Sequence, residues 1–213
     1  MENRTDTART ALVTGGGSGI GLACVTQLAQ QGVRVAMNHL EEDAQGPEQV
    51  ARLRAQGLDV IAAPGNVSVP GGAERMVEAA IAALGGLDYL VNNAGISGTR
   101  DPIPASALEQ IDEDLWMALL NTNLIGVFRC AKAAAPALRA SGGAIVNTAS
   151  TAGMGLQGSS TPYAASKSGV VSVTRSLARG LAPDVRVNAV APGPIWTPIQ
   201  PASFDGETVA GMG

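Results

Sequence analysis

Short apolar runs alternate with longer amphipathic stretches along the chain. Six runs are typical of buried parallel strands: TALVTG (10–15), VRVAMN (33–38), DVIAAP (59–64), LDYLVNN (87–93), GAIVNTAS (143–150) and VRVNAVAPG (185–193). The stretches of helical character lie at 22–31, 47–56, 73–84, 108–139 and 163–181. Strand alternating with helix indicates right-handed βαβ units. We therefore predict an α/β fold with a single doubly wound, Rossmann-like parallel sheet and helices on both of its faces.

Composition and charge narrow the class of protein. With 213 residues, 46% hydrophobic and 15% charged, the chain can bury the core of one large domain. We predict a disordered tail over residues 1–9 and one domain over 10–213. A net charge of -4 with scattered basic residues argues against a nucleic-acid partner. No apolar run has the length of a membrane helix and the N-terminus is polar, so we expect a cytoplasmic protein without a membrane partner.

The cysteines and the histidine give no sign of a metal or hydrolase site. Cys24 and Cys130 are far apart without CxxC spacing, which is typical of small buried side chains. His39 is the single histidine, and no cluster of histidines and carboxylates has the spacing of metal ligands. We therefore expect no metal and no histidine-dependent triad.

A glycine-rich stretch, TGGGSGIG over residues 14–21, follows the first predicted strand and precedes a helical pattern. Glycine lets the backbone approach a pyrophosphate, and the helix N-terminus offers free N–H groups to an anion. The spacing of Gly15, Gly19 and Gly21 is neither the G-x-G-x-x-G fingerprint nor a P-loop. By itself this stretch predicts a phosphate-binding turn, with a glycine turn that binds nothing as the alternative.

The segment TPYAASK, residues 161–167, holds one of only two tyrosines in the chain. Thr161 suits a helix N-cap and Pro162 suits the first turn, so Tyr163 and Lys167 would lie one turn apart on one face. A nearby ammonium would favour the tyrosinate and so equip Tyr163 for acid/base chemistry. The alternative is a surface helix with an incidental aromatic side chain and a solvated lysine.

Taken in order, TGGGSGIG, the NNAG of residues 92–95, Ser150, Tyr163 and Lys167 resemble the short-chain dehydrogenase/reductase family, over about residues 10–197. The resemblance implies a nicotinamide-dependent oxidoreductase that interconverts an alcohol and a ketone or aldehyde. Tyr163 would transfer the proton, Lys167 would hold the cofactor ribose, and Ser150 would polarise the carbonyl. Asn123 would support a proton relay through a water. Thr148 and Thr151 compete with Ser150, and Asn121 competes with Asn123.

The resemblance also implies the residues of the binding sites. Those that would bind the cofactor are Gly15, Gly17, Ser18, Gly19, Ile20, Gly21, Asn38, His39, Leu40, Asn66, Val67, Asn93, Ala94, Gly95, Tyr163, Lys167, Pro192, Gly193, Ile195 and Thr197; the substrate would contact Ser150, Tyr163 and Gly193. The second strand ends without the carboxylate that an NAD enzyme usually places there, which slightly favours NADP over NAD. Asn66 stands where relatives usually carry an aspartate, although an amide can still accept a hydrogen bond from adenine.

The expected partner is a small-molecule carbonyl or alcohol, and we expect a homodimer or homotetramer formed through helices 108–139 and 163–181. Relatives continue beyond the position of Gly213 with a helix and a strand, so we expect a shortened C-terminal end and an exposed edge strand at 185–193. Two other possibilities remain open: a dinucleotide-binding protein without turnover, and an inactive truncated fragment.

Overall fold

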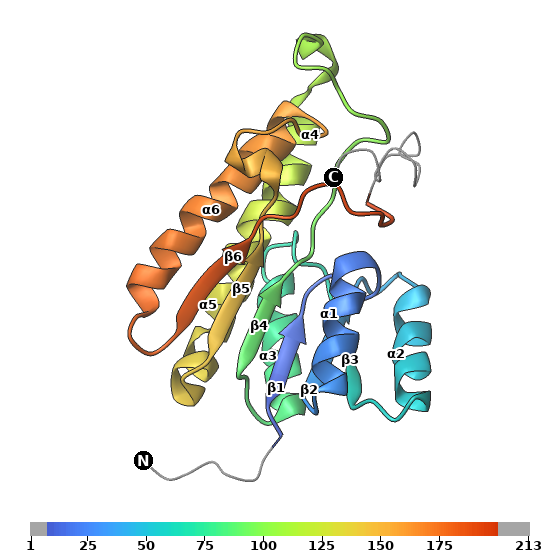
Figure 1. The fold of residues 1–213 in the computed structure, drawn as a ribbon, viewed down its shortest axis with the longest axis vertical. Coiled ribbons are helices and arrows are strands. Elements are labelled where there is room, and N and C mark those ends of the chain that lie inside the picture. The colour runs from blue at the N-terminus through green and yellow to red at the C-terminus, as the bar shows by residue number, and fades with distance from the viewer. Residues whose placement is uncertain (1–7, 200–213) are drawn as a thin grey trace.

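The computed structural model describes residues 8–199 and contains one six-stranded parallel sheet (Figure 1). The strands are β1 (Thr10–Val13), β2 (Arg34–His39), β3 (Val60–Pro64), β4 (Tyr89–Asn92), β5 (Ala144–Thr148) and β6 (Arg186–Val190). Their order across the sheet is β3-β2-β1-β4-β5-β6, and all five pairings are parallel. The order reverses between β1 and β4, which is where doubly wound sheets bind ligands. The predicted fold class is confirmed.

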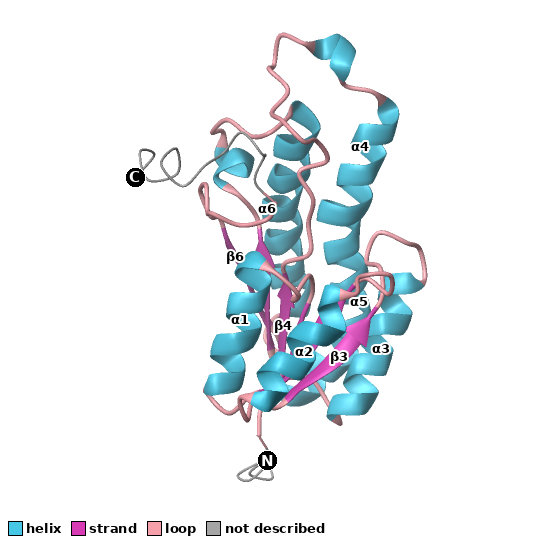
Figure 2. Ribbon diagram, turned by 90° about the vertical axis from the view of Figure 1, so that its right-hand side faces the viewer, coloured by secondary structure: helices cyan, strands magenta, loops and turns pink. Residues whose placement is uncertain are grey.

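Helices cover both faces of the sheet (Figure 2). They are α1 (Gly19–Gln30), α2 (Gln45–Ala55), α3 (Gly72–Leu84), α4 (Glu113–Leu119), α5 (Gly126–Ser141) and α6 (Thr161–Leu181). One buried cluster joins α1 and α2 to one face through residues such as Val25, Leu53 and Met37. A second cluster joins α3, α5 and the end of α6 to the other face, with Leu138 and Ile145 fully buried. The apolar strand runs are therefore buried on both sides near the centre of the sheet.

The predicted helix 108–139 is divided in the structure, so that prediction was wrong as a single helix. Leu108–Gln110 is a separate 3-10 turn, and α4 starts after Asp112, whose Oδ1 accepts a hydrogen bond from Leu115 N at 2.8 Å. Between α4 and α5, residues Leu120–Ile125 form a π-helical segment. Periodicity does not reveal a π segment, because it inserts one extra residue without interrupting the helix.

The N-cap of α6 also differs from the prediction. Ser160, and not Thr161, is the capping residue, because its Oγ accepts a hydrogen bond from Tyr163 N at 3.2 Å. Tyr163 nevertheless lies in the first turn, with Pro162 just before it. The displacement of the cap by one residue leaves Tyr163 and Lys167 one helical turn apart.

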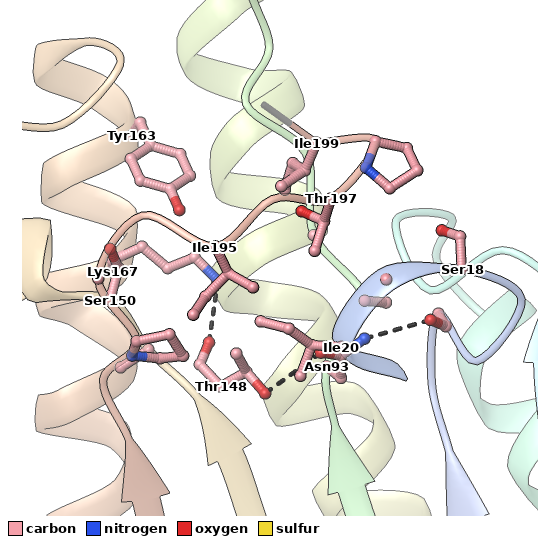
Figure 3. Close-up of a pocket in the computed structure, with 18 residues that line it drawn as sticks. Ser18, Ile20, Asn93, Thr148, Ser150, Tyr163, Lys167, Ile195, Thr197 and Ile199 are labelled. Atoms are coloured by element: carbon pink, nitrogen blue, oxygen red, sulfur yellow. Dashed lines mark hydrogen bonds between the residues drawn. The ribbon is translucent and has the colours of Figure 1, made fainter. Parts of the chain in front are cut away.

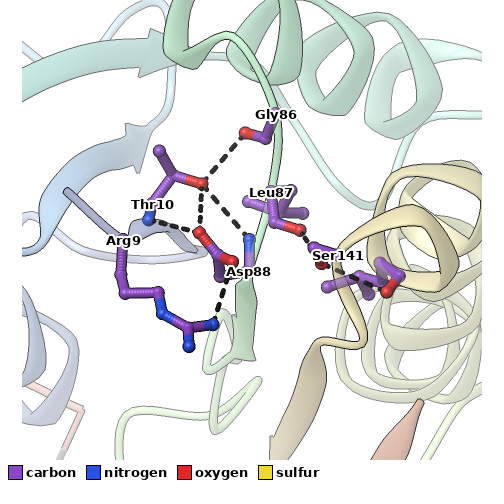
Figure 4. Close-up of polar contacts among 7 residues, drawn as sticks. Arg9, Thr10, Gly86, Leu87, Asp88 and Ser141 are labelled. Atoms are coloured by element: carbon purple, nitrogen blue, oxygen red, sulfur yellow. Dashed lines mark hydrogen bonds and ion pairs between the residues drawn. The ribbon is translucent and has the colours of Figure 1, made fainter. Parts of the chain in front are cut away.

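Polar contacts hold the amino end of the sheet together (Figure 4). Asp88 is fully buried, and its carboxylate accepts hydrogen bonds from Thr10 N at 2.8 Å and Thr10 Oγ1 at 3.1 Å. The Arg9 side chain forms an ion pair with the same carboxylate at 3.2 Å. The backbone oxygen of Arg9 accepts a hydrogen bond from Arg34 N. Arg9 is therefore tied to the sheet, whereas residues 1–7 of the predicted tail lie outside the described residues.

The carboxyl ends of all six strands lie at the opposite end of the sheet from these contacts (Figure 1). Within the described part of the chain, β6 is an edge strand, and four of its five residues are exposed. No helix in residues 8–199 is long and apolar enough to cross a bilayer.

Candidate active site and cofactor cleft

An open cleft of about 200 Å³ lies at the carboxyl ends of β1, β4, β5 and β6. It is lined by Gly15, Ser18, Gly19, Ile20, Asn93, Ala94, Gly95, Thr148, Ala149, Ser150, Tyr163, Lys167, Pro192, Gly193, Ile195, Thr197, Pro198 and Ile199. Fourteen of these are residues that the sequence singled out for the site. Segments distant in the sequence meet here because parallel strands place all their carboxyl ends at one edge.

The glycine turn forms one wall of the cleft. Gly15 and Gly19 have φ angles of +61° and +50°, which favour glycine. Gly21 packs so closely that an added Cβ would overlap the carbonyl oxygen of Gly15. Ser18 is the N-cap of α1, yet its side chain makes no capping hydrogen bond. The first N–H groups of α1 are therefore available to an anion in the cleft.

Asn38 on β2 and the backbone that follows β4 hold this turn in place. Asn38 Oδ1 accepts a hydrogen bond from Gly15 N at 3.1 Å, and Asn38 O accepts one from Gly16 N at 2.8 Å. Thr14 Oγ1 accepts bonds from the backbone N–H groups of Asn93 and Ala94. The turn is therefore preorganised by the protein itself and does not need a ligand to shape it.

The reactive side chains gather at the opposite wall, where Tyr163 and Lys167 project from α6 toward the end of β5 (Figure 3). Burial raises the pKa of Tyr163 above its ordinary value, and a side-chain hydrogen bond with Ser150 opposes the rise. Burial also lowers the pKa of Lys167 to about 8. The Lys167 ammonium lies 5.9 Å from the centre of the Tyr163 ring and donates a hydrogen bond to Thr148 O at 2.9 Å. The expected lowering of the Tyr163 pKa is thus not found, because desolvation outweighs the favourable contact with Ser150.

Asn123 is fully buried behind the cleft and does not line it. Its Oδ1 accepts a hydrogen bond from Ile96 N at 2.8 Å, while its Nδ2 donates to Ile96 O and to Ser166 Oγ. Asn121, its competitor, has its Oδ1 bonded to Arg129 instead. Asn123 lies in the π-helical segment, and its side chain joins that segment to the loop after β4 and to α6.

Several other predicted residues lie outside the cleft lining: Gly17, Gly21, Asn38, His39, Leu40, Asn66 and Val67. The Asn38 amide is fully occupied, since its Nδ2 donates to Ala63 O and Gly65 O. His39 is buried, and its Nδ1 donates to Leu40 O at 2.8 Å. Asn66 Oδ1 accepts bonds from Ser68 N and Ser68 Oγ, which closes its own loop.

Three lining residues were missed, namely Ala149, Pro198 and Ile199, and a fourth, Thr148, was considered only as a competitor of Ser150. Thr148 and Ala149 end the same apolar run as Ser150, and their place at a strand's carboxyl end was the available signal. Pro198 and Ile199 follow Thr197 in a loop whose course no sequence pattern indicates.

The cleft fits a dinucleotide. The Oγ1 of Thr197 is buried without a hydrogen-bond partner among the described residues. An added Cβ on Gly95 would lie 3.5 Å from Lys167 Nζ, so the absence of a side chain keeps space open beside the ammonium. The glycine turn lets the backbone come close to a pyrophosphate, and the free N–H groups of α1 can bind it. The Lys167 ammonium suits the hydroxyls of a ribose, and the unpaired Thr197 hydroxyl suits a carboxamide.

Comparison with known proteins identifies the family. The model of the short chain dehydrogenase family matches residues 9–208. The chain belongs to the short-chain dehydrogenase family.

Relatives in this family are similar over most of the chain. The 3-oxoacyl-[acyl-carrier-protein] reductase FabG of Staphylococcus aureus is 39% identical over 199 residues, which are 92% of this chain and 78% of FabG. A short chain dehydrogenase from Burkholderia cenocepacia, solved in complex with NADP, is 36% identical with a TM-score of 0.83, covering 98% of this chain and 82% of that one. A variant of actinorhodin polyketide ketoreductase, solved with NADPH, is 37% identical with a TM-score of 0.80. The likeness covers 90% of this chain and 72% of that one. The resemblance seen in the sequence is confirmed, and the chain is an oxidoreductase of this family.

Proposed function

We propose that the protein interconverts an alcohol and a ketone or aldehyde, with NADP or NAD as the hydride carrier. The observation that carries the proposal is the convergence of Ser150, Tyr163 and Lys167 on one cleft whose other wall is a preorganised glycine turn. A phosphate-binding turn and a proton donor in one cleft are what hydride transfer to a carbonyl requires.

Each reactive residue has a role in the reduction. When bound, the nicotinamide cofactor would supply the hydride that the carbonyl carbon accepts. The Tyr163 hydroxyl would give its proton to the carbonyl oxygen, so that C=O becomes CH–OH. Burial raises the pKa of Tyr163, which keeps the phenol protonated at neutral pH and suits it as an acid in this direction. Ser150 would donate a hydrogen bond to the same oxygen and polarise the carbonyl. In oxidation the same groups act in reverse.

Lys167 and Asn123 support these roles. The buried ammonium of Lys167 lies beside Gly95, where it would hold the hydroxyls of the nicotinamide ribose. Asn123 would take part in proton relay through the π-helical segment, whose irregular backbone lies behind Tyr163 and Lys167. Thr197, with its unpaired hydroxyl, would bind the carboxamide of the nicotinamide.

NADP is the cofactor we favour. Neither Asn38 nor His39 places a carboxylate at the end of β2, and two similar solved structures hold NADP or NADPH. Asn66 and Val67 would lie near the adenine, although the carbonyl of Asn66 already serves its own loop.

We propose an apolar carbonyl compound as the substrate. Met154, Leu156 and Trp196 are each 60% or more exposed. Met154 ends the 3-10 turn that follows Ser150, Leu156 lies just after that turn, and Trp196 lies in the loop after Gly193. Among residues 8–199, Lys167 is the only charged residue in the cleft lining, so this part of the chain offers no second fixed charge for an anionic substrate.

A dimer or tetramer is proposed through α4, α5 and α6. Phe128 and Met117 are about half exposed on these helices, and Ser168 and Ser172 lie exposed on α6 while Val170 is buried in the core. Small side chains let a second copy approach closely.

Titration with NADPH and NADH, followed by fluorescence, tests the proposal, and a panel of apolar ketones and aldehydes should follow with the cofactor that binds. Binding together with turnover would support the proposed reaction. Binding without turnover by any carbonyl would favour a dinucleotide-binding protein instead, and the absence of binding would contradict the proposal.

A further inference from the structure

The loop that follows β3, residues 66–69, packs against the first turn of α5. The Val67 side chain is 5% exposed and belongs to the buried cluster that α3 and α5 share. An added Cβ on Gly126 would lie 3.1 Å from Val67 Cγ2 and 3.1 Å from Val67 O. The absence of a side chain at Gly126 therefore lets α5 come close to the backbone of this loop, which we call the β3 loop.

Arg129 lies one turn after Gly126 on α5, and its guanidinium group bonds to the β3 loop. Its Nη1 donates to Ser68 O at 2.8 Å and to Val67 O at 3.3 Å. Its Nη2 donates to Asn121 Oδ1 at 3.4 Å, which holds the guanidinium against the π-helical segment. In the described part of the chain Arg129 forms no ion pair, so these hydrogen bonds all go to neutral oxygens.

Two successive peptide units of the β3 loop are held at both ends. Asn66 binds their N–H groups: its Oδ1 accepts a hydrogen bond from Ser68 N at 2.9 Å, and its backbone oxygen accepts one from Val69 N at 3.4 Å. Arg129 binds their carbonyl groups, Val67 O and Ser68 O. The protein itself therefore fixes the course of this loop, and Arg129 supplies the hydrogen bonds that come from outside it.

The place of the β3 loop in the fold gives Arg129 a role in binding. The loop follows the carboxyl end of β3, beside β2, and ligands of doubly wound sheets lie at the carboxyl ends of the strands. We propose that Arg129 is a positioning residue for the cofactor, which keeps the β3 loop in the shape that receives the adenine. The proposal rests on the proposed dinucleotide binding, in which Asn66 and Val67 lie near the adenine. Because its Nη1 and Nη2 are directed at protein oxygens, Arg129 acts through the loop and not by contact with the cofactor.

A planar fork suits this position better than a single ammonium. The guanidinium spans from the β3 loop to Asn121, whereas a lysine ammonium is a point charge on a flexible stem. Arg129→Lys thus keeps the charge and loses the bridge, and Arg129→Met loses both. If Arg129 acted only by long-range attraction of an anionic cofactor, Arg129→Lys would bind the cofactor as the parent does.

The test measures dissociation constants for two pairs of ligands, ADP with NADH and 2′,5′-ADP with NADPH. It compares the parent chain, Arg129→Met, Arg129→Lys and the control Lys132→Met. Lys132 is exposed on the same helix, so its variant has the same change of net charge as Arg129→Met.

We expect Arg129→Met to raise the dissociation constants by about tenfold, because the apparent affinity falls with the fraction of molecules whose loop has the receptive shape. Arg129→Lys should raise them by about threefold or more, because it lacks the fork. Lys132→Met should change them by less than about twofold, because an exposed charge is screened.

The effect on the two members of a pair distinguishes positioning from a general loss of structure. The nucleotide and the dinucleotide of each pair share the adenosine end, so a change confined to the β3 loop raises both constants by the same factor. General disruption of the cleft would weaken the dinucleotide more and would lower the temperature of unfolding. With a carbonyl that is turned over, KM for the cofactor should rise about tenfold while kcat at saturation stays within about twofold.

The outcomes separate the role of Arg129 from the proposed function. Equal rises for both members of a pair in Arg129→Met, with weakened binding in Arg129→Lys, support it. A rise below about twofold, parent-like binding by Arg129→Lys, or a rise for the dinucleotide alone overturns it while cofactor binding stands. Failure of the parent chain to bind any of the four ligands overturns both. Should Arg129→Met not fold, Arg129→Gln, which loses the charge and the fork but retains a donor, takes its place in the same comparison.

Discussion

Lys167 Nζ donates a hydrogen bond to the carbonyl oxygen of Thr148 at 2.9 Å, which links α6 to the carboxyl end of β5. Ser150 follows Thr148 by two residues, so this bond sets the position of Ser150 relative to Tyr163, one turn before Lys167 on α6. The ammonium is thereby held 5.9 Å from the centre of the Tyr163 ring. The contact explains how a buried charge is retained in the cleft before any ligand binds.

We expect Tyr163→Phe to lower the turnover rate by about 10²–10⁴ and to leave the dissociation constant of the cofactor within about twofold. Phenylalanine keeps the packing of the ring but has no proton to transfer. Steady-state kinetics and cofactor fluorescence measure the two effects separately. Tyr89→Phe, which changes the chain's other tyrosine on β4, is the matched control and should retain the parent activity. Activity above about a tenth of the parent in Tyr163→Phe would show that Tyr163 is only a packed aromatic.

Lys167 should make stability depend on pH in the alkaline range. Its pKa is about 8 in the folded chain and 10.5, the ordinary value for lysine, in the unfolded chain, so between these values the unfolded chain binds more protons. Stability contributed by this group therefore rises with pH through that window, and below about pH 8 the cost of burying the charge is fully present. We expect the free energy of unfolding of the parent, relative to Lys167→Met, to rise by roughly 2 kcal/mol from pH 7 to pH 10.

Denaturant unfolding of both proteins at several pH values measures this difference. The variant also loses the bond to Thr148 O, but that loss is an offset that does not vary with pH. A difference that stays constant from pH 7 to pH 10 would mean that Lys167 keeps an ordinary pKa in the folded chain.

Two glycines of the turn should differ in how much an alanine in their place lowers stability. An added Cβ on Gly21 would overlap Gly15 O, whereas one on Gly17 meets nothing closer than 3.7 Å. Gly21→Ala should lower the free energy of unfolding by about 3 kcal/mol or more, because the turn must open to accept the methyl group. Gly17→Ala should stay within about 1 kcal/mol of the parent. Thermal or chemical unfolding decides, and equal stability of the two variants would refute the close packing of Gly21 on Gly15.

The buried carboxylate at the amino end should matter for stability and not for catalysis. The Asp88 carboxylate accepts hydrogen bonds from Thr10 and Arg9, and Asp88→Asn replaces one of its two acceptor oxygens by an NH₂ group that can only donate. We therefore expect the free energy of unfolding to fall by about 2 kcal/mol. Arg9→Ala should cost less than about 1 kcal/mol, because the Arg9 side chain is 59% exposed. Turnover per folded molecule should equal that of the parent in both variants, since the cleft is at the other edge of the sheet. A selective loss of turnover would contradict a structural role.

The pattern of apolar runs was sufficient to predict the parallel sheet. Buried parallel strands need continuous apolar residues, and that requirement is local enough to be visible in runs such as TALVTG and VRVAMN. The glycine turn and the Tyr163–Lys167 pair were visible for the same reason, since each depends on spacing within one segment.

Contacts between segments could be known only from the tertiary structure. The π-helical segment at Leu120–Ile125 and the cap at Ser160 depend on packing and on backbone geometry that neighbouring residues in the sequence do not specify. The pKa of Tyr163 rises because other segments desolvate it, although the sequence places a lysine one turn away. Arg129 shows the same limit: it bonds to Ser68 O, although the two residues are 61 positions apart in the sequence. The sequence by itself determined which local elements form and which residues are chemically capable, and only the packing of those elements decided which polar atoms face the cleft and which are already bonded to the protein.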